Sequence, residues 1–593
     1  MIGGTRLSVL YLSITLVVLL QNPSEQCQEA TTAELAQDWW ETAQFYQIYP
    51  RSFKDSDGDG IGDLKGITSK LEYLKDIGVT ATWLSPIYTS PMVDFGYDIS
   101  NFFDIQPEYG TLEDFRGLMA KAKELGLKII LDFVPNHSST ENEWFKKSVN
   151  REKGYEDYYV WSDGKLDENG QRQPPSNWLS GFRGSAWQWN EQRQQYYLHQ
   201  FAVQQADLNY RNPAVVEQMK RVLRYWLDMG VDGFRIDAAT LLFEAKPDEL
   251  GIYPDEEVSG LTDDKEDRNY LKMEKVDLQP ESIDMIYQWR QVMDDYQRIH
   301  GGDTRVLLIE TYAPMWYTMQ MYGNSTTKGA ELPFNFNLIT EVDTGFSAKD
   351  VQKAVDDWLT KMPAGGTANW VIGNHDRRRA ASRYGLRNID GMNMLVMLLP
   401  GVSVTYQGEE LGMTDGVISW EETVDPAACN SNPDIFENLT RDPCRTPFQW
   451  SAEKNAGFSE GNKTWLPLAS GYETVNVEAE SSADKSHLKI YKELVALRGT
   501  SKTLQQGSYK YKALNDGVFV LKRYLPGSET LLYVANYGEG SYSANIVENF
   551  DVTLPSSMNV KISSMDSKQN AGTSVTLNKI SLAPGEALVL GTK

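Results

Sequence analysis

Eight short apolar runs alternate with amphipathic helical stretches between residues 45 and 407, and this alternation is the strongest constraint on the fold. Helical stretches such as 111–126 and 214–230 have apolar residues three and four apart and end in glycine. Repeated strand–helix units build a parallel sheet, and eight of them predict an eight-stranded β/α barrel. The strand-like runs are FYQIYP (45–50), ATWLSP (81–86), KIILDFVPN (128–136), GFRIDA (233–238), RVLLIE (305–310), PFNFNL (333–338), NWVIGN (369–374) and VSVTYQ (402–407).

Two segments fall outside this alternation. Residues 138–206, rich in Trp, Gln, Asn and Pro, separate the third strand from the next helix, and a structureless loop of that length is unusual in a compact domain. After about residue 505 the helical stretches stop and short runs with turn residues follow, which indicates a C-terminal antiparallel β-sandwich. The predicted fold is therefore α/β, with a barrel over 38–137 and 207–500, an inserted domain over 138–206 and a β-sandwich over 505–593.

Three acidic residues stand where apolar runs end. They are Asp237 in GFRID, Glu310 in RVLLIE and Asp376 in NWVIGNHD. Barrel strands are buried on both faces, and their carboxyl ends open onto the face that carries the active site of such folds. We therefore expect these three carboxyl groups to converge in one pocket.

The N-terminal sequence has the layout of a signal peptide. Arg6 precedes an apolar stretch from Leu7 to Leu20, which is shorter than the roughly 20 residues that a membrane-spanning helix needs. We predict that residues 1–24 are a signal peptide and that the protein is secreted or extracellular. An uncleaved signal anchor is the alternative, which leaves cell-surface attachment open.

The charge balance constrains the class of ligand. The formal net charge is −25, and no basic patch offsets it, so nucleic acid and anionic lipid are disfavoured as partners. A neutral substrate fits better. The 16 Trp and 31 Tyr supply flat apolar faces with polar edges, of the kind that stack on sugar rings, although most are expected in the core.

The sparse cysteines and the sequons bear on export. Cys429 and Cys444 are expected to form a disulfide in a secreted protein, with Cys27 left unpaired or linked to another chain. No Cys/His cluster has zinc spacing, which argues against a zinc enzyme. We predict N-glycosylation at three sequons, whose acceptors are Asn324, Asn438 and Asn462.

Six motifs, in order along the chain, resemble those of the α-amylase superfamily of glycoside hydrolases, family 13, and within it the insect maltases. The resemblance covers nearly all of the chain after the predicted signal peptide. The motifs are DFVPNHSS (132–139), QADLNY (205–210), GFRIDAAT (233–240), the LIE that ends at Glu310, VIGNHD (371–376) and YQGEELGM (406–413).

The resemblance assigns roles to the three acids. It implies that Asp237 is the nucleophile, that Glu310 is the general acid/base and that Asp376 binds sugar hydroxyls in the transition state. Cleavage of a glycosidic bond passes through an oxocarbenium-like cation and needs such a carboxylate pair. Arg235 lies two residues before Asp237, on the same face of the strand, and is expected to keep the nucleophile ionised. Glu310 must instead be protonated near neutral pH, which requires a raised pKa.

Several further residues are predicted to bind the sugar. Two of the five histidines, His137 and His375, lie in Asn-His pairs at strand ends, where we expect them to contact hydroxyls. Asp98 resembles the ligand of the terminal glucose in the family, with Tyr97 stacked beneath that glucose. In the run Arg377 to Arg379 at least one guanidinium is expected to contact Asp376 or a hydroxyl, and we include Arg379 among the binding residues.

The segment 55–63 alternates oxygen ligands with glycines and suits a hard cation. It is not an EF-hand, because the twelfth position is Gly66 where a bidentate Glu is required. The resemblance implies a structural Ca²⁺ on the first barrel connection, away from the chemistry; an acidic turn without metal is the alternative. The expected ligands are Asp55, Asp57, Asp59, Ile61 and Asp63.

The resemblance implies a retaining, exo-acting α-glucosidase that releases α-glucose from the non-reducing end of maltose and short α-1,4-glucosides through a covalent glucosyl-enzyme. In the resembling family a small residue directly after the nucleophile, here Ala238, goes with α-1,4 linkages rather than α-1,6, and sucrose is a further expected substrate. Two alternatives remain: a chaperone-like protein similar to amino-acid-transporter heavy subunits, and a surface binding protein without activity, because fold does not fix function. Transglucosylation through the same intermediate is also open, and oligomeric state is not predicted.

Overall fold

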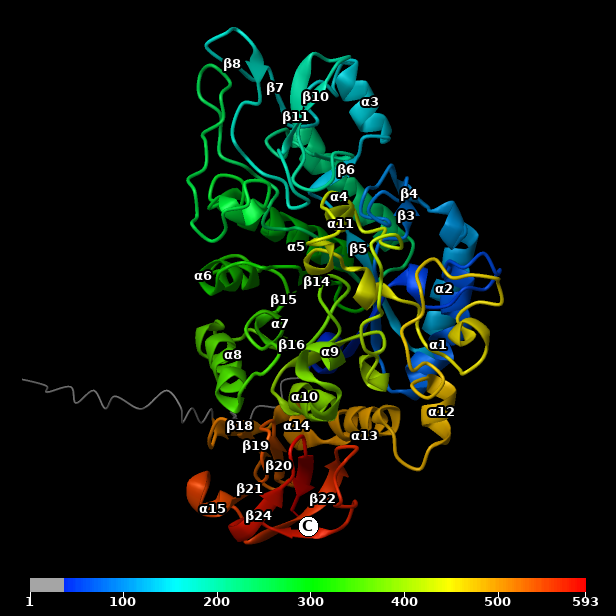
Figure 1. Cartoon of the computed structure of the whole chain (residues 1–593), viewed down its shortest axis with the longest axis vertical. Helices are drawn as coiled ribbons and strands as arrows, with labels where there is room; N and C mark the ends of the chain where they lie inside the picture. The colour runs from blue at the N-terminus through cyan, green and yellow to red at the C-terminus, as the bar shows by residue number, and fades with distance from the viewer. Residues whose placement is uncertain (1–36, 593) are drawn as a thin grey trace, which may run out of the picture.

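The computed structural model describes residues 37–592, so the predicted signal peptide and Cys27 lie outside the described residues. In Figure 1 the barrel occupies the middle of the molecule, the inserted segment lies at the top and the C-terminal sheet at the bottom. Within residues 37–592 no helix is both long and apolar enough to cross a membrane.

An eight-stranded parallel sheet forms the centre of the fold, in the order β15-β14-β13-β5-β2-β1-β17-β16. The Asn369 side chain joins the two outer strands, because it donates to the Pro333 carbonyl and accepts from the Asn335 amide. The predicted α/β barrel is therefore confirmed. The strands are β1 (Gln44–Ile48), β2 (Ala81–Leu84), β5 (Lys128–Phe133), β13 (Gly233–Ile236), β14 (Val306–Ile309), β15 (Leu332–Pro333), β16 (Asn369–Val371) and β17 (Val402–Tyr406).

Alternate residues of each barrel strand enter two different cores. In β14, Val306 and Leu308 pack inside the barrel, whereas Leu307 and Ile309 face the surrounding helices. This period of two follows from the pleat of a strand. The helices that cover the barrel include α1 (Leu64–Asp76), α2 (Leu112–Leu125), α4 (Pro213–Asp228), α5 (Pro280–His300), α8 (Ala348–Lys361), α10 (Ile389–Leu398) and α13 (His487–Thr500).

Local signals fix the ends of these helices. At the start of α2, the Thr111 hydroxyl accepts from the Asp114 amide and the Asp114 carboxylate accepts from the Thr111 amide, which is a capping box. The same helix ends at Gly126, whose φ of 71° is the left-handed conformation that glycine adopts readily. One predicted strand was largely wrong: in PFNFNL (333–338) only Pro333 pairs, and Asn337 already begins the short helix α7 (Asn337–Thr340).

The inserted segment carries its own small sheets, at the top of the molecule in Figure 1. A three-stranded sheet joins β10 (Trp187–Asn190), β11 (Gln195–Leu198) and β7 (Trp161–Ser162). Two strands at its base, β6 (His137–Ser139) and β12 (Gln205–Asp207), pair with each other and connect it to the barrel. Trp178 and Trp187 pack there against Tyr253 and Leu271, which come from the loop between β13 and α5.

The C-terminal part is built on a six-stranded antiparallel sheet, in the order β18-β19-β20-β25-β22-β23. One face packs on α10 and α13 through residues such as Phe519 and Tyr533. The other face is covered by the two-stranded pair β21 (Tyr542–Ala544) and β24 (Ile580–Leu582) with α15 (Ile546–Asn549), so the second layer is only partly sheet. The strands of the main sheet are β18 (Ser508–Ala513), β19 (Val518–Tyr524), β20 (Leu531–Asn536), β25 (Ala587–Gly591), β22 (Ser557–Ser563) and β23 (Ser574–Thr576).

Candidate active site

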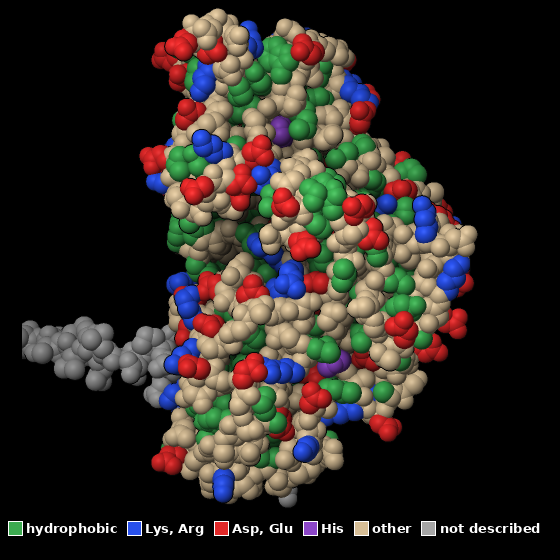
Figure 2. All heavy atoms as spheres, in the orientation of Figure 1, with side chains coloured by type: hydrophobic (Ala, Val, Ile, Leu, Met, Phe, Trp, Pro, Cys, Tyr) green, Lys and Arg blue, Asp and Glu red, His purple; other side chains and the backbone are tan. Residues whose placement is uncertain are grey.

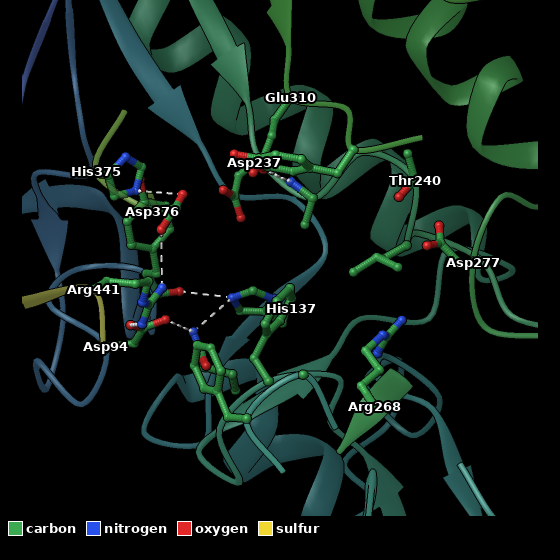
Figure 3. A pocket seen from close by; sticks show the side chains of 18 of the residues that line it. Asp94, His137, Asp237, Thr240, Arg268, Asp277, Glu310, His375, Asp376 and Arg441 are labelled. Atoms are coloured by element: carbon green, nitrogen blue, oxygen red, sulfur yellow. Dashed lines mark hydrogen bonds and ion pairs between the residues drawn. The ribbon is translucent and has the colours of Figure 1, made fainter. Parts of the chain in front are cut away.

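The three acids at strand ends line one cavity of about 310 Å³. Asp237 follows β13, Glu310 follows β14, and Asp376 lies in the loop after β16. Figure 2 shows a hollow at mid-height, below the inserted segment, and Figure 3 shows the cavity from close by. Its volume is at the lower end of the range that is typical of small-molecule sites. It is lined by Asp94, Tyr97, His137, Gly181, Phe182, Phe201, Gln205, Asp237, Ala238, Thr240, Leu241, Arg268, Asp277, Glu310, Tyr312, His375, Asp376, Arg377 and Arg441.

Arg235 forms the centre of the polar floor. Its guanidinium donates to Asp237 at 2.5 Å and to both carboxylate oxygens of Asp132 at 2.9 Å, and it lies 3.0 Å from Glu310 Oε2. The backbone amide of Ala238 donates to the same Glu310 oxygen at 2.8 Å. Because Arg235 is only 1% exposed, these contacts are shielded from solvent, and one cation holds the two carboxyl groups of the expected nucleophile and acid in a fixed relation.

The two carboxyl groups differ in their tendency to ionise. Burial raises the pKa of Glu310 to about 8, although Arg235 opposes the shift, and the charges of Asp237 and Asp376 add to it. Burial also raises the pKa of Asp237, to about 6, although its contact with Arg235 opposes the shift. Near neutral pH this arrangement gives one protonated and one ionised carboxyl group, which is the division that acid-and-nucleophile chemistry requires.

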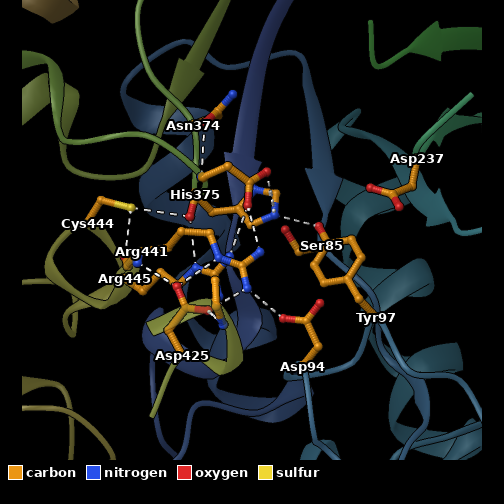
Figure 4. A network of polar contacts seen from close by, with 12 residues as sticks. Ser85, Asp94, Tyr97, Asp237, Asn374, His375, Asp425, Arg441, Cys444 and Arg445 are labelled. Atoms are coloured by element: carbon orange, nitrogen blue, oxygen red, sulfur yellow. Dashed lines mark hydrogen bonds and ion pairs between the residues drawn. The ribbon is translucent and has the colours of Figure 1, made fainter. Parts of the chain in front are cut away.

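Asp376 is held as an anion by arginines from a distant part of the chain. Its Oδ1 accepts from Arg445 at 3.0 Å and from Arg441 at 3.3 Å. Figure 4 shows these two arginines beside His375 and Asp425. Burial alone would raise the pKa of Asp376, but His375, Arg441 and Arg445 hold it below the ordinary value. Asp376 therefore presents a charged acceptor to any hydroxyl group in the cavity.

Tyr97, His375 and His137 form the wall beside Asp376. The rings of Tyr97 and His375 are stacked 5.3 Å apart, and the Tyr97 hydroxyl lies 2.7 Å from His375 Nε2. Burial lowers the pKa of His375 well below its ordinary value and that of His137 to about 4, so both rings are neutral at pH 7. A neutral imidazole can both donate and accept, which suits hydroxyl groups.

Three predicted binding residues do not line the cavity: Arg235, which lies beneath the two acids, and Asp98 and Arg379. The Asp98 carboxylate is fully buried and accepts from the Ser90 hydroxyl and from the amides of Val93 and Asp94, so it shapes a turn. Arg379 is 2% exposed, donates to the Gln407 carbonyl and lies over the Tyr406 ring. Asp94 and Arg441, in contrast, line the cavity and are bonded to each other at 2.8 Å.

Sequence reasoning also missed the opposite wall. Arg268 and Asp277 come from the loop between β13 and α5, while Phe182 and Phe201 come from the inserted segment. These residues have no strand periodicity and no motif. The only sequence signal there is the acidic, irregular composition of the stretch 241–285, which assigns no role to a particular residue.

The predicted calcium loop brings three acids together. The carboxylate oxygens of Asp55, Asp57 and Asp63 lie within 4.8 Å of one another. Asp59 is turned toward the backbone, because its side chain accepts from the Ile61 amide. Asp55 accepts from the amides of Asp57, Gly58 and Gly60, which fixes the loop around it. The hard oxygen donors fit Ca²⁺, with Asp59 outside the cluster.

The predicted disulfide is wrong in this structure, because both Cys429 and Cys444 are free. Cys444 is buried beneath the site, with its Sγ 3.2 Å from the His375 carbonyl and 3.1 Å from the Arg441 carbonyl. Cys429 is exposed at the end of α11 (Pro426–Cys429). The three sequon asparagines, Asn324, Asn438 and Asn462, are exposed and therefore sterically accessible, which leaves glycosylation a prediction.

Comparisons with known proteins agree with this geometry. The family described as alpha amylase, catalytic domain, matches residues 47–507. The chain is 53% identical to maltase A1 of Drosophila melanogaster (87% of this chain, 90% of that protein) and 50% identical to the salivary alpha-glucosidase of Anopheles gambiae (93% of each). It is also 38% identical to an amino acid transporter heavy chain of Rattus norvegicus (93% of this chain, 78% of that protein).

Solved structures give the same result. Trehalulose synthase MutB of Pseudomonas mesoacidophila, solved as a mutant in complex with its substrate sucrose, aligns with a TM-score of 0.79 at 31% identity, over 94% of this chain and all of that chain. An alpha-glucosyl transfer enzyme, XgtA, aligns with a TM-score of 0.80 at 32% identity over the same shares.

Proposed function

Because the chain belongs to the α-amylase family of glycoside hydrolases, we propose that it is a retaining α-glucosidase that releases α-glucose from the non-reducing end of maltose and short α-1,4-glucosides, with sucrose as a further substrate. The single observation that carries the proposal is the convergence of Asp237 and Glu310 on Arg235 at the edge of a cavity lined with polar side chains.

The first step is attack by the Asp237 carboxylate on the anomeric carbon, while Glu310 gives its proton to the leaving oxygen. This forms the glucosyl ester of Asp237 and releases the rest of the sugar as an alcohol. Glu310, now ionised, then takes a proton from water as the water oxygen displaces Asp237, so the released glucose keeps the α-configuration. The raised pKa of Glu310 supports its role as acid, and Arg235 supports the ionised state of Asp237.

A polar group at one end of the cavity supports exo-action. Asp94, Arg441 and Asp376 are hydrogen-bonded to one another there and would hold the hydroxyls of a terminal glucose. Arg441 is also bonded to Asp425, which is fully buried, so its orientation is fixed before substrate binds. A longer chain would have to pass through this group, which favours terminal cleavage.

The test is hydrolysis of maltose, isomaltose and sucrose by the purified protein and by Asp237→Asn, with the released anomer followed by NMR. We expect α-glucose from maltose, much slower release from isomaltose, and loss of activity by about 10⁴-fold or more in the variant. Release of β-glucose would exclude retention, and rapid cleavage of isomaltose would reverse the linkage assignment.

The likeness to the rat transporter heavy chain carries a second candidate, a partner-binding protein without hydrolytic activity. The same assay decides between them, because such a protein turns over none of the three sugars. We also propose secretion, supported by the likeness to salivary alpha-glucosidases, to be checked by the N-terminal sequence of protein from the medium.

We further propose that Asp55, Asp57 and Asp63 hold a structural Ca²⁺. The loop packs closely on residues 459–465; a Cβ at Gly60, whose φ is 97°, would lie 2.5 Å from the Lys463 carbonyl oxygen. A cation there would neutralise the repulsion among the three carboxylates and fasten the first barrel connection. Chelation is expected to lower the melting temperature, and Ca²⁺, but not the same concentration of Na⁺, to restore it; no shift would exclude the site.

A further inference from the structure

The cavity has two polar sides, and only one of them is internally paired. On the paired side, Asp376, Arg441 and Asp94 are joined by ion pairs. Figure 3 shows Arg268, Asp277 and Thr240 on the other side, with Asp237 and Glu310 between the two sides and no dashed line joining Arg268 to Asp277. Both charged residues are half-buried.

Asp277 is fixed relative to the nucleophile. It lies in the loop before α5 and shares hydrogen bonds with the Leu278 amide and the Thr240 side chain. The Leu278 amide also donates to the Thr240 carbonyl at 3.1 Å. Thr240 is three residues after Asp237 at the end of β13, so Asp277 is attached to the strand end that carries the nucleophile.

Arg268 is attached to the inserted segment from the other direction. Its guanidinium makes only long hydrogen bonds, at 3.4 Å to the Leu179 carbonyl and at 3.5 Å to Gln200 Oε1. Gln200 is itself fixed by bonds to Asp207 and to the Leu241 carbonyl. The described residues supply no direct ion-pair partner for the guanidinium.

A cation and an anion that face one cavity without contact are unusual, because half-buried charges normally pair with each other. A hydroxyl group can satisfy both at once, since it donates to a carboxylate and accepts from a guanidinium. A sugar ring offers such hydroxyl groups on adjacent carbons.

Resting on the proposed function, we propose that Arg268 and Asp277 bind the hydroxyls of the leaving sugar, the ring on the far side of the bond that is cleaved. The paired side then binds the glucose that is transferred, and the loop between β13 and α5 selects what that glucose is attached to. A sugar leaving group gains these contacts, and an aromatic leaving group does not.

The experiment compares maltose with 4-nitrophenyl α-glucoside for the wild type, Asp277→Asn and Arg268→Gln. We expect each variant to lose about 10- to 100-fold in kcat/KM on maltose, because a charged hydrogen bond to substrate is removed, and less than about 3-fold on the aryl glucoside. The matched control is Asp264→Asn, on the same loop, whose carboxylate pairs with Arg183 outside the cavity. It should behave as wild type on both substrates.

The outcomes distinguish a failure of the proposed function from a failure of the inference about Arg268 and Asp277. A wild-type protein that is inactive on both substrates overturns the proposed function and this inference with it. An active wild type whose variants lose both activities equally, or lose neither, overturns only the inference. Melting temperatures identify a variant that fails to fold, and the second variant then gives the answer.

Discussion

At the carboxyl end of the barrel Arg235 donates to carboxylates, whereas at the opposite end Arg498 and Arg523 donate only to backbone carbonyls. All three are at most 4% exposed. Arg498 contacts the carbonyls of Met397, Leu399 and Gly401, at and after the end of α10. The last carbonyls of a helix have no partner within the helix and carry partial negative charge, so a buried guanidinium satisfies them.

The difference shows two uses of the same buried group. At the catalytic end the guanidinium sets the ionisation of carboxyl groups, and the raised pKa of Glu310 shows that the folded state resists their full ionisation. At the other end Arg523 satisfies helix ends and fastens the C-terminal sheet to the barrel. The first arrangement should serve activity at a cost in stability, and the second should serve stability alone.

The largest effect is expected for Glu310→Gln. Without its acid, the enzyme should lose about 10³-fold or more in kcat on maltose, whose leaving oxygen needs a proton. Activity on α-glucosyl fluoride should fall much less, because fluoride leaves without protonation. Steady-state rates on both substrates check this; equal losses would mean that Glu310 acts other than as the proton donor.

For Arg523→Leu the comparison predicts a loss of stability and not of activity. Arg523 donates to the Leu398 carbonyl at the end of α10 and to carbonyls around α14 (Lys502–Gln506), including Leu504. Its loss should lower the free energy of unfolding by about 3 kcal/mol, because buried carbonyls lose their partner. Activity per folded molecule should not change. Arg298→Leu is the control, since that side chain is 71% exposed. If Arg523→Leu is as stable as wild type, Arg523 does not stabilise the fold.

Glu310→Gln should also alter stability, in a direction set by its pKa. The folded state keeps the Glu310 proton up to about pH 8, whereas the unfolded chain releases it near 4.5. The folded state therefore binds more protons in this range, and stability falls as pH rises from 4.5 to 8. Gln cannot ionise, so the variant should be more stable than wild type at pH 9, with no gain at pH 4.5. Chemical denaturation at the two pH values measures this, and a gain that is equal at both would contradict it.

The sequence predicted the parts of the molecule that repeat. Strand residues such as Ile309 and Glu310 follow a local period, and the ends of parallel strands must share one face, so the three acids could be placed together. The 333–338 strand failed because only Leu332 and Pro333 pair before the chain turns into α7.

The residues that the sequence did not predict depend on contacts between distant loops. Asp94 and Asp98 lie in one loop, and only the amides that surround Asp98 show which carboxylate is used to shape the turn. The bond to Asp425 holds the Arg441 side chain at the site. The Arg268 side chain is held there by its contact with the Leu179 carbonyl of the inserted segment. No local pattern encodes such packing, which is why the three acids and the wall formed by Tyr97, His137 and His375 were predictable and the opposite wall was not.

The smallest predicted effect is at the boundary between barrel and C-terminal sheet, where a charge pair supplements the backbone contacts. His487 Nδ1 lies 2.7 Å from Asp390 on α10, and the other Asp390 oxygen accepts from the Met565 amide. Burial alone would lower the pKa of His487, but Asp390, with Glu480 and Asp566, raises it above 6.5. The folded state therefore binds this proton more tightly, and the resulting stability is complete below pH 6.5 and is lost as pH rises through the folded pKa.

His487→Gln should therefore destabilise the protein by about 1 kcal/mol at pH 5.5 and by less at pH 8.5. His300→Gln is the matched control, because His300 is exposed at the end of α5. Unfolding curves at both pH values give the difference. If His487→Gln lowers the free energy of unfolding equally at both pH values, the pair acts through packing and not through charge. This end of the molecule would then be held without pairs of opposite charge, as it is where Arg498 and Arg523 donate to backbone carbonyls.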